Sequence, residues 1–292
     1  MSAITPAVEE LPEQTTAAAE TWRNFRTNPL GVASMIILGL LTVVALAAPL
    51  IAPYPEGYGT DVLAPPSAQH WFGTDTLGRS VLAEVVWGAR VSMIVAVLSS
   101  MLAIGIGVLV GVLGAYFKKV DTVLGLIVDL CLTLPVLPLM ILVAALAGPS
   151  LRTIVLVIAF FSWPEVARVV RSQALTVVQL SYVDAAKVLG GPHHWIVRRH
   201  LLPAVAPVIT VSVVLTASRA VLSEAGLSFL GLGDPNNWSW GRILYEAQQS
   251  GAMSSAWWTT LFPSLAILLL VVAATLMSLT YNDARNPRSR QD

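Results

Sequence analysis

Three ionisable side chains lie within or at the edges of long apolar stretches. Asp129 follows Lys119 by about three helical turns, and Arg219 and Glu224 lie five positions apart farther along. A charge at membrane depth costs a few kcal/mol and usually pairs with another charge or lines a water-filled path. Asp129, Arg219 and Glu224 are therefore candidates for lining a translocation pathway, with structural pairing or packing as the alternative for each. The spacing of five places Arg219 and Glu224 on different sides of a helix, so we expect no local pair between them.

The basic residues exclude two other kinds of chemistry. A phosphate-binding loop needs a lysine followed by Ser or Thr after a glycine-rich turn. Lys118, Lys119 and Lys187 are followed by Lys, Val and Val, so we expect no ATP site and no catalytic role in this chain. The 17 basic and 17 acidic residues cancel, which leaves no electrostatic footprint for nucleic acid.

Histidine and cysteine do not form a metal-binding pattern. His193, His194 and His200 lack acidic or cysteine companions at ligand spacing, so we expect them to be solvated or to face a partner. Cys131 is alone, which excludes an internal disulfide and a cysteine metal cluster.

The composition places these residues in a membrane protein. The chain is 55% hydrophobic and 12% charged, whereas soluble domains carry about 25% charged residues. Crossing a hydrocarbon layer of about 30 Å takes about 20 apolar residues. Residues 32–51, 91–117 and 257–281 meet this requirement without a single charge. We expect an all-α polytopic membrane protein with six transmembrane helices.

The three remaining spans are interrupted by charges, prolines or polar residues. They are expected near 122–147, from about 153, and over roughly 203–223. Past Pro164, three charged residues follow one another at helical spacing and are expected to emerge into water: Glu165, Arg168 and Arg171. In the second span, Gly107 and Gly111 form a GxxxG pair, which lets two helix backbones approach closely.

The basic residues in the connecting segments orient the chain. With the N-terminus inside, the cytoplasmic segments hold twelve of them: Arg23, Arg26, Lys118, Lys119, Arg168, Arg171, Lys187, Arg198, Arg199, Arg285, Arg288 and Arg290. The outer segments hold four: Arg79, Arg90, Arg152 and Arg242. We therefore expect a multi-pass cell-membrane protein with both termini in the cytoplasm and without a cleaved signal peptide.

This orientation divides the chain into five parts. They are a cytoplasmic N-terminal segment at 1–30, a first transmembrane helix at 31–53, an extracytoplasmic segment at 54–90, a core of five transmembrane helices at 91–282 that includes a cytoplasmic loop at 172–203, and a cytoplasmic tail at 283–292. Four tryptophans before and at the start of the last span are expected to anchor it at the membrane interface: Trp238, Trp240, Trp257 and Trp258.

The cytoplasmic loop is predicted to form a helix, a tight turn and a second helix. Ser181 followed by Asp184 has the spacing of a capping box and favours a helix start. Gly190 begins a Gly-Gly-Pro run that stops this helix and permits a sharp turn. A second short helix is expected to end at Leu202, with Pro203 in the first turn of the next span. Small side chains and a tight turn suit a helix that lies in a groove of another protein.

This loop resembles the EAA loop of binding-protein-dependent ABC importers, whose coupling helix docks onto the ATP-binding subunit. The matching residues are Asp184, Ala185, Ala186, Gly190, His200, Leu202 and Pro203. Two of them depart from the family pattern, because Asp184 stands where Glu is usual and His200 where an aliphatic residue is common. The resemblance implies that these seven positions couple the chain to an ATPase.

Other segments resemble the C-type permease of dipeptide, oligopeptide and nickel importers. One runs from Phe72 through Gly73-Thr74-Asp75 to Arg79, and another from Glu224 to Gly233 with Ser239-Trp240-Gly241 following. In the second segment the resemblance implies an outer gate or receptor contact at Leu227, Ser228, Phe229, Gly231, Gly233 and Trp240.

The resemblance implies a type I ABC importer permease that works in a heteromeric complex. Its partners would be a second permease, two ATP-binding domains or subunits that hold ATP and Mg, an extracytoplasmic solute-binding protein, membrane lipid and a peptide substrate. If Arg219 faces the cavity, it would meet a peptide carboxylate; a packing or interface role is the alternative.

Several alternatives stay open at this stage. The same architecture could import nickel chelates, glutathione or sugars instead of peptides. An ion-driven secondary transporter is a second class, although no clear internal repeat is visible. A membrane scaffold that transports nothing is a third.

Overall fold

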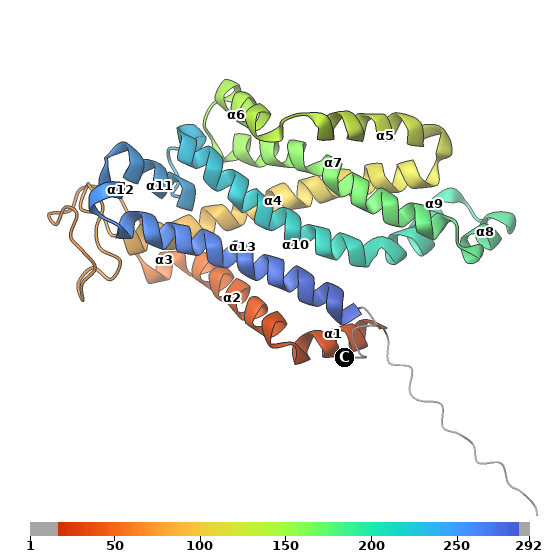
Figure 1. The fold of residues 1–292 in the computed structure, drawn as a ribbon, viewed down its shortest axis with the longest axis horizontal. Helices are drawn as coiled ribbons and strands as arrows, with labels where there is room; N and C mark the ends of the chain where they lie inside the picture. The colour runs from red at the N-terminus through yellow and green to blue at the C-terminus, as the bar shows by residue number, and fades with distance from the viewer. Residues whose placement is uncertain (1–16, 286–292) are drawn as a thin grey trace, which may run out of the picture.

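The computed structural model describes residues 17–285, and these form a bundle of helices (Figure 1). The helices are α1 (Ala17–Thr27), α2 (Pro29–Leu46), α3 (Ala48–Ile51), α4 (Val81–Tyr116), α5 (Lys118–Thr133), α6 (Val136–Ala147), α7 (Leu151–Val178), α8 (Ser181–Val188), α9 (His193–Ile196), η1 (Val197–Leu201), α10 (Leu202–Leu227), η2 (Ser228–Leu232), α11 (Trp240–Gln249), α12 (Ala252–Ser255) and α13 (Trp258–Arg285). Within 17–285 there is no strand, only an isolated bridge between Thr74 and Ser80. The predicted all-α class is confirmed.

The long apolar helices agree with six spans. Five helical stretches, which include α2, α4, α7 and α13, are long and apolar enough to cross a membrane, and α5 with α6 makes a sixth if that bent pair is one span. The predicted continuous span at 122–147 is broken, because α5 and α6 meet at 86°. Leu134 adopts an extended conformation before Pro135, since a proline ring disfavours the helical conformation of the residue that precedes it.

Three predicted element boundaries differ from the structure. α4 begins at Val81, inside the segment predicted to be extracytoplasmic, because Ser80 caps it and no helix breaker follows. α7 continues past Pro164 to Val178, so Glu165 lies in mid-helix. The second short helix does not end at Leu202, because helical structure continues from His193 through η1 into α10. The amide of Leu202 bonds to the carbonyl of Val197 in a wider π-turn, which accommodates the proline that follows.

The core of the bundle is the packing of α4 against α7 and α10. A Cβ added at Gly107 would lie 2.6 Å from Val166, and one at Gly111 would lie 2.7 Å from the carbonyl oxygen of Ala167. The predicted close approach through the GxxxG pair is therefore confirmed, with α7 as the partner helix.

The bundle has two distinct ends (Figure 1). One carries α8 and α9, and the other carries α11, α12 and the irregular segment 52–80. α1 lies beside the last turn of α13, where the Asn24 side chain donates to the carbonyl of Ala284 at 3.2 Å. The two ends of the described chain are thus held together.

Candidate functional site

The helix α8 forms where the loop pattern predicted it, but its start is stabilised differently. Leu180 occupies the capping position and no side chain caps the helix, so the predicted capping box is wrong. Asp184 lies in the first turn, where the helix dipole favours its charge, and pairs with Lys187 at 3.0 Å. This pair is exposed, so the buried face of the helix, formed by Val183 and Ala186, is what holds it in place.

One face of α8 is anchored and its end is free. Val183 and Ala186 are buried against Ile196 and Leu201, in a cluster that includes side chains of α4 and α7. Beyond them Val188 and Leu189 are each 87% exposed. Gly190 follows with φ +78°, and its amide bonds to the carbonyl of Lys187 at 3.0 Å. The predicted glycine turn is confirmed, and it leaves an apolar tip, Val188–Leu189, facing outward.

His200 packs against the start of α8 from the side of η1. Its ring lies 5.6 Å from the ring of Tyr182 on α8 and 5.0 Å from that of Trp195. Its buried Nε2 atom has no hydrogen-bond partner. The remaining loop residues differ in burial: Leu202 is half-buried, and Ala185, Gly190 and Pro203 are exposed.

The three histidines do not converge. His193 contacts the Tyr116 hydroxyl through Nδ1 at 2.9 Å, away from the ring stack around His200. Across residues 17–285, no three His, Cys, Asp or Glu side chains come together in a way that could hold a metal ion.

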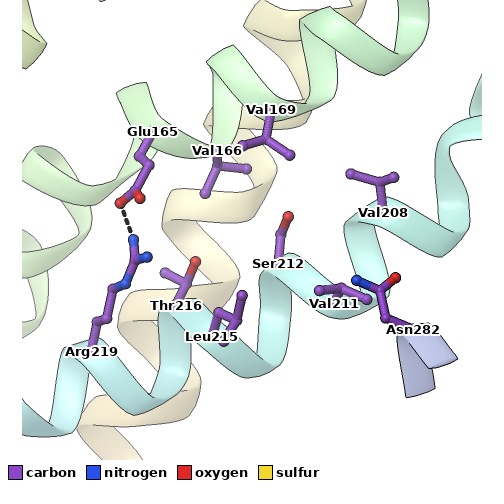
Figure 2. A pocket seen from close by; sticks show the side chains of 10 residues that line it. All are labelled: Glu165, Val166, Val169, Val208, Val211, Ser212, Leu215, Thr216, Arg219 and Asn282. Atoms are coloured by element: carbon purple, nitrogen blue, oxygen red, sulfur yellow. Dashed lines mark ion pairs between the residues drawn. The ribbon is translucent and has the colours of Figure 1, made fainter. Parts of the chain in front are cut away.

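A second candidate site is a cavity of about 260 Å³ between α7 and α10 (Figure 2). Glu165 on α7 and Arg219 on α10 form an ion pair across its mouth. Ser212 and Thr216 place hydroxyl groups on its wall, and Asn282 of α13 lies at its far end. The other lining residues are valine and leucine: Val166, Val169, Val208, Val211 and Leu215. Glu165, which was predicted to emerge into water, has a side chain that is 52% exposed and pairs with Arg219.

The three pathway candidates lie in three different environments. Arg219 lines the cavity, while Asp129 is exposed and pairs with Arg168 at 2.6 Å, on the side of α7 that faces α5. Glu224 is only 1% exposed and accepts hydrogen bonds from Ser228 at 2.6 Å and Ser92 at 3.3 Å. Asp129 and Arg219 each form an exposed ion pair, Glu224 is packed in the core, and Arg219 does not pair with Glu224.

The residues of the implied outer gate are divided between the core and the surface. Leu227, Ser228 and Trp240 are buried, with the Trp240 indole donating to the carbonyl of Val85 at 2.9 Å. Phe229 and Gly233 are half-buried, and Gly231 is exposed with φ +82° beside the ring of Tyr245. The prediction that the four tryptophans anchor the last span at the membrane interface is wrong for Trp238, Trp240 and Trp258, because they are buried in the protein. Trp257 is exposed.

Sequence reasoning missed an ion cluster at the α12 end. The Arg79 side chain bonds to Asp75 at 2.7 Å and Glu246 at 2.6 Å, and lies 3.4 Å from Glu84. Its guanidinium also lies 4.6 Å from the centre of the Trp238 ring. Burial alone would lower the pKa of Arg79, but the carboxylates of Glu84 and Asp75 raise it above its usual value, so the charge persists.

This cluster connects the segment 52–80 to α11. Asp75 and Arg79 belong to a motif that the sequence made visible, whereas Glu246 lies 167 positions away and carries no local signal. The contacts of this cluster hold the irregular segment 52–80 on the bundle.

The long apolar helices, with the exposed tip of α8 at one end, define an α-helical membrane protein. Residues 103–290 match the family of binding-protein-dependent transport system inner membrane components, and residues 16–66 match the N-terminal transmembrane domain of oligopeptide transport permease C. The chain belongs to the dipeptide/oligopeptide family of ABC importer permeases.

Relatives from several bacteria align over nearly the whole chain. The dipeptide transport system permease protein DppC of Bacillus subtilis is 35% identical over 93% of this chain and 86% of its own. A protein named as a peptide permease in Brucella suis is 34% identical over 96% of this chain and 94% of its own. A chain from the crystal structure of an amino acid ABC transporter with histidines is 17% identical, with a TM-score of 0.49 over 72% of this chain and 95% of that one.

Proposed function

We propose that this chain forms half of the pathway of an importer for di- or oligopeptides, and that it couples to ATPase subunits through α8. The family is a non-catalytic membrane component of ABC transporters, which removes the ion-driven secondary transporter from consideration. A second permease, two ATP-binding subunits and an extracytoplasmic solute-binding protein complete the complex. ATP hydrolysis takes place in those partner subunits.

The observation that carries the coupling proposal is the apolar tip at Val188–Leu189. Large apolar side chains that project into water mark interaction surfaces, and the helix that carries this tip is anchored by the buried Val183 and Ala186. A docked helix transmits motion only if it moves with the spans, and the packing of Val183 against the core of α4 and α7 provides that link. We therefore assign the cytoplasmic side of the membrane to the α8 end.

Peptides are proposed as substrates because the relatives are named as dipeptide and peptide permeases. Nickel chelates and glutathione are the alternatives that keep the same architecture. The test is ATPase activity of the complete reconstituted importer against short peptides, nickel complexes and glutathione. Stimulation by peptides alone supports the proposal, stimulation by another class replaces the substrate, and a response to none of them supports a scaffold.

Coupling is tested by Leu189→Asp, which puts a charge into the docking surface without disturbing the fold, because this side chain is exposed. We expect peptide-stimulated ATPase to fall roughly tenfold or more, as for loss of an interface anchor. The matched control is Lys187→Ala on the same helix, which removes an exposed ion pair worth at most about 1 kcal/mol. Normal stimulation in Leu189→Asp, at normal complex assembly, would contradict the docking role.

A further inference from the structure

We propose that Glu165 and Arg219 form a subsite for the charged ends of a peptide with a free amino and a free carboxyl terminus, at the middle of the pathway. Arg219 takes the carboxylate and Glu165 takes the ammonium group. This inference rests on the proposed peptide import, and it names the residues that receive the substrate inside this subunit.

The first argument is the depth of the pair. Glu165 lies 14 positions after the start of α7 and 13 before its end (165 − 151 and 178 − 165), about 20 Å from each at 1.5 Å per residue. The Arg219 and Glu165 side chains are 56% and 52% exposed. Charges that face lipid at this depth are strongly unfavourable, and those that occur line water-filled cavities or interfaces. This face of α7 and α10 is therefore turned toward a pathway or a partner subunit.

The second argument is the cavity beside the pair. Ser212 and Thr216 add hydroxyl groups to a wall that is otherwise valine and leucine (Figure 2). Pockets that enclose a whole small ligand measure about 300–1,000 Å³, so a space of about 260 Å³ lies just below that range and suits a peptide short enough to present both of its ends there. Apolar walls with a few convergent polar groups are the usual composition of a ligand site.

The third argument is charge balance. A peptide with free termini carries one positive and one negative charge, as the Glu165–Arg219 pair does. Exchanging the internal pair for two pairs with the peptide changes no net charge, so the peptide passes without leaving an unpaired ion at membrane depth. The internal pair re-forms when the peptide leaves. Transport needs this kind of site, favourable enough to enter and weak enough to release.

The first experiment tests whether the cavity is open to water. In a Cys131→Ser chain assembled in the complete importer, Leu215→Cys is treated with a membrane-impermeant thiol reagent, because Leu215 lines the cavity and is only half-buried. The control is Leu269→Cys at an exposed position of α13. We expect Leu215→Cys to react and Leu269→Cys to stay unlabelled, and we expect a free-terminus peptide with ATP to change the labelling rate of Leu215→Cys at least severalfold. Absence of labelling at Leu215→Cys would assign this face to packing against the second permease and overturn the inference.

The second experiment tests the chemistry of recognition. Uptake is compared for a peptide with a free carboxylate and its C-terminal amide, chosen so that the binding protein binds both equally. We expect Arg219→Gln to reduce uptake of the free acid roughly tenfold more than that of the amide, the size expected for one charge-assisted hydrogen bond. Glu165→Gln, tested with free and N-acetylated peptides, should give the matching loss for the free amino end.

The controls separate a subsite from a structural link. The double variant Glu165→Gln/Arg219→Gln leaves no unpaired charge. If it restored the uptake of both the free and the capped peptide that the single variants lose, the losses would come from an unpaired charge, and the subsite would be overturned. Equal losses of free and capped peptides in Arg219→Gln would do the same. If the unmodified importer takes up no peptide at all, the proposed function fails instead.

Discussion

Close packing between α4 and α7 depends on glycines, which have no side chain. Gly107 and Gly111 bring the two backbones together, and each leaves no room for a Cβ atom. Gly105 lies in the same helix, but a Cβ atom added there would have no heavy atom within 4 Å. Of these three glycines, only Gly107 and Gly111 are therefore needed for the close approach of α7. The difference between them is a property of the neighbouring helix.

Gly111→Val should destabilise the complex, because its Cβ would meet the carbonyl of Ala167 at 2.7 Å and the amide of Arg171 at 3.0 Å. Overpacking of this kind costs about 1–3 kcal/mol. A lower melting temperature of the purified complex in detergent would show this. Gly105→Val is the matched control and should melt with the unmodified protein; an equal loss in both variants would refute the spacer role.

Arg79→Lys should loosen the segment 52–80, although it keeps the charge. A lysine cannot reproduce the forked contacts of Arg79 with Asp75 and Glu246, and losing one hydrogen bond to a charged group costs about 1.5–3 kcal/mol.

Limited proteolysis of the segment 52–80 measures this loosening. Arg90→Lys is the comparison, since Arg90 is exposed and lies over the ring of Trp87. Cleavage that is equally slow in the Arg79→Lys chain and in the unmodified chain would show that the cluster does not hold the segment.

At the scale of elements, α8 is positioned by what surrounds it more than by its own sequence. The helix has eight residues and no side-chain cap, and an isolated helix of that length is marginal in water. Burial of Val183 and the ring contacts of His200 supply what the helix lacks.

His200→Ala should weaken coupling, because it removes the ring that lies between Tyr182 and Trp195. His200→Phe should preserve coupling, since the buried Nε2 makes no hydrogen bond that phenylalanine would lose. The measurement is the number of peptides transported per ATP hydrolysed. Equal losses in both variants would mean that the imidazole itself contacts a partner.

At the scale of the whole molecule, the arrangement of the ends makes a prediction about topology. Tyr58 in the segment 52–80 and Val188 on α8 are 86% and 87% exposed, and they belong to opposite ends of the bundle (Figure 1). In intact cells carrying the Cys131→Ser background, an impermeant thiol reagent should label Tyr58→Cys and should reach Val188→Cys only after permeabilisation. Labelling of both, or of Val188→Cys alone, would reverse or reject the proposed orientation.

The sequence by itself determined the features that depend on local chemistry. Apolar runs predict membrane helices because a span must satisfy its backbone internally, and the six-span count and the all-α class followed from them. The glycine turn at Gly190 was predictable because a positive φ is open mainly to glycine. The family was also visible, since its motifs are contiguous segments.

Only the tertiary structure decided how the charges pair. Glu165 and Arg219 lie 54 positions apart (219 − 165), and Arg79 meets Glu246 across 167. No periodicity links such residues, because their distance is set by how helices pack. The side of a helix that faces a neighbouring helix is fixed only when the bundle assembles. For this reason the sequence did not predict that Glu224 and three of the four tryptophans are buried.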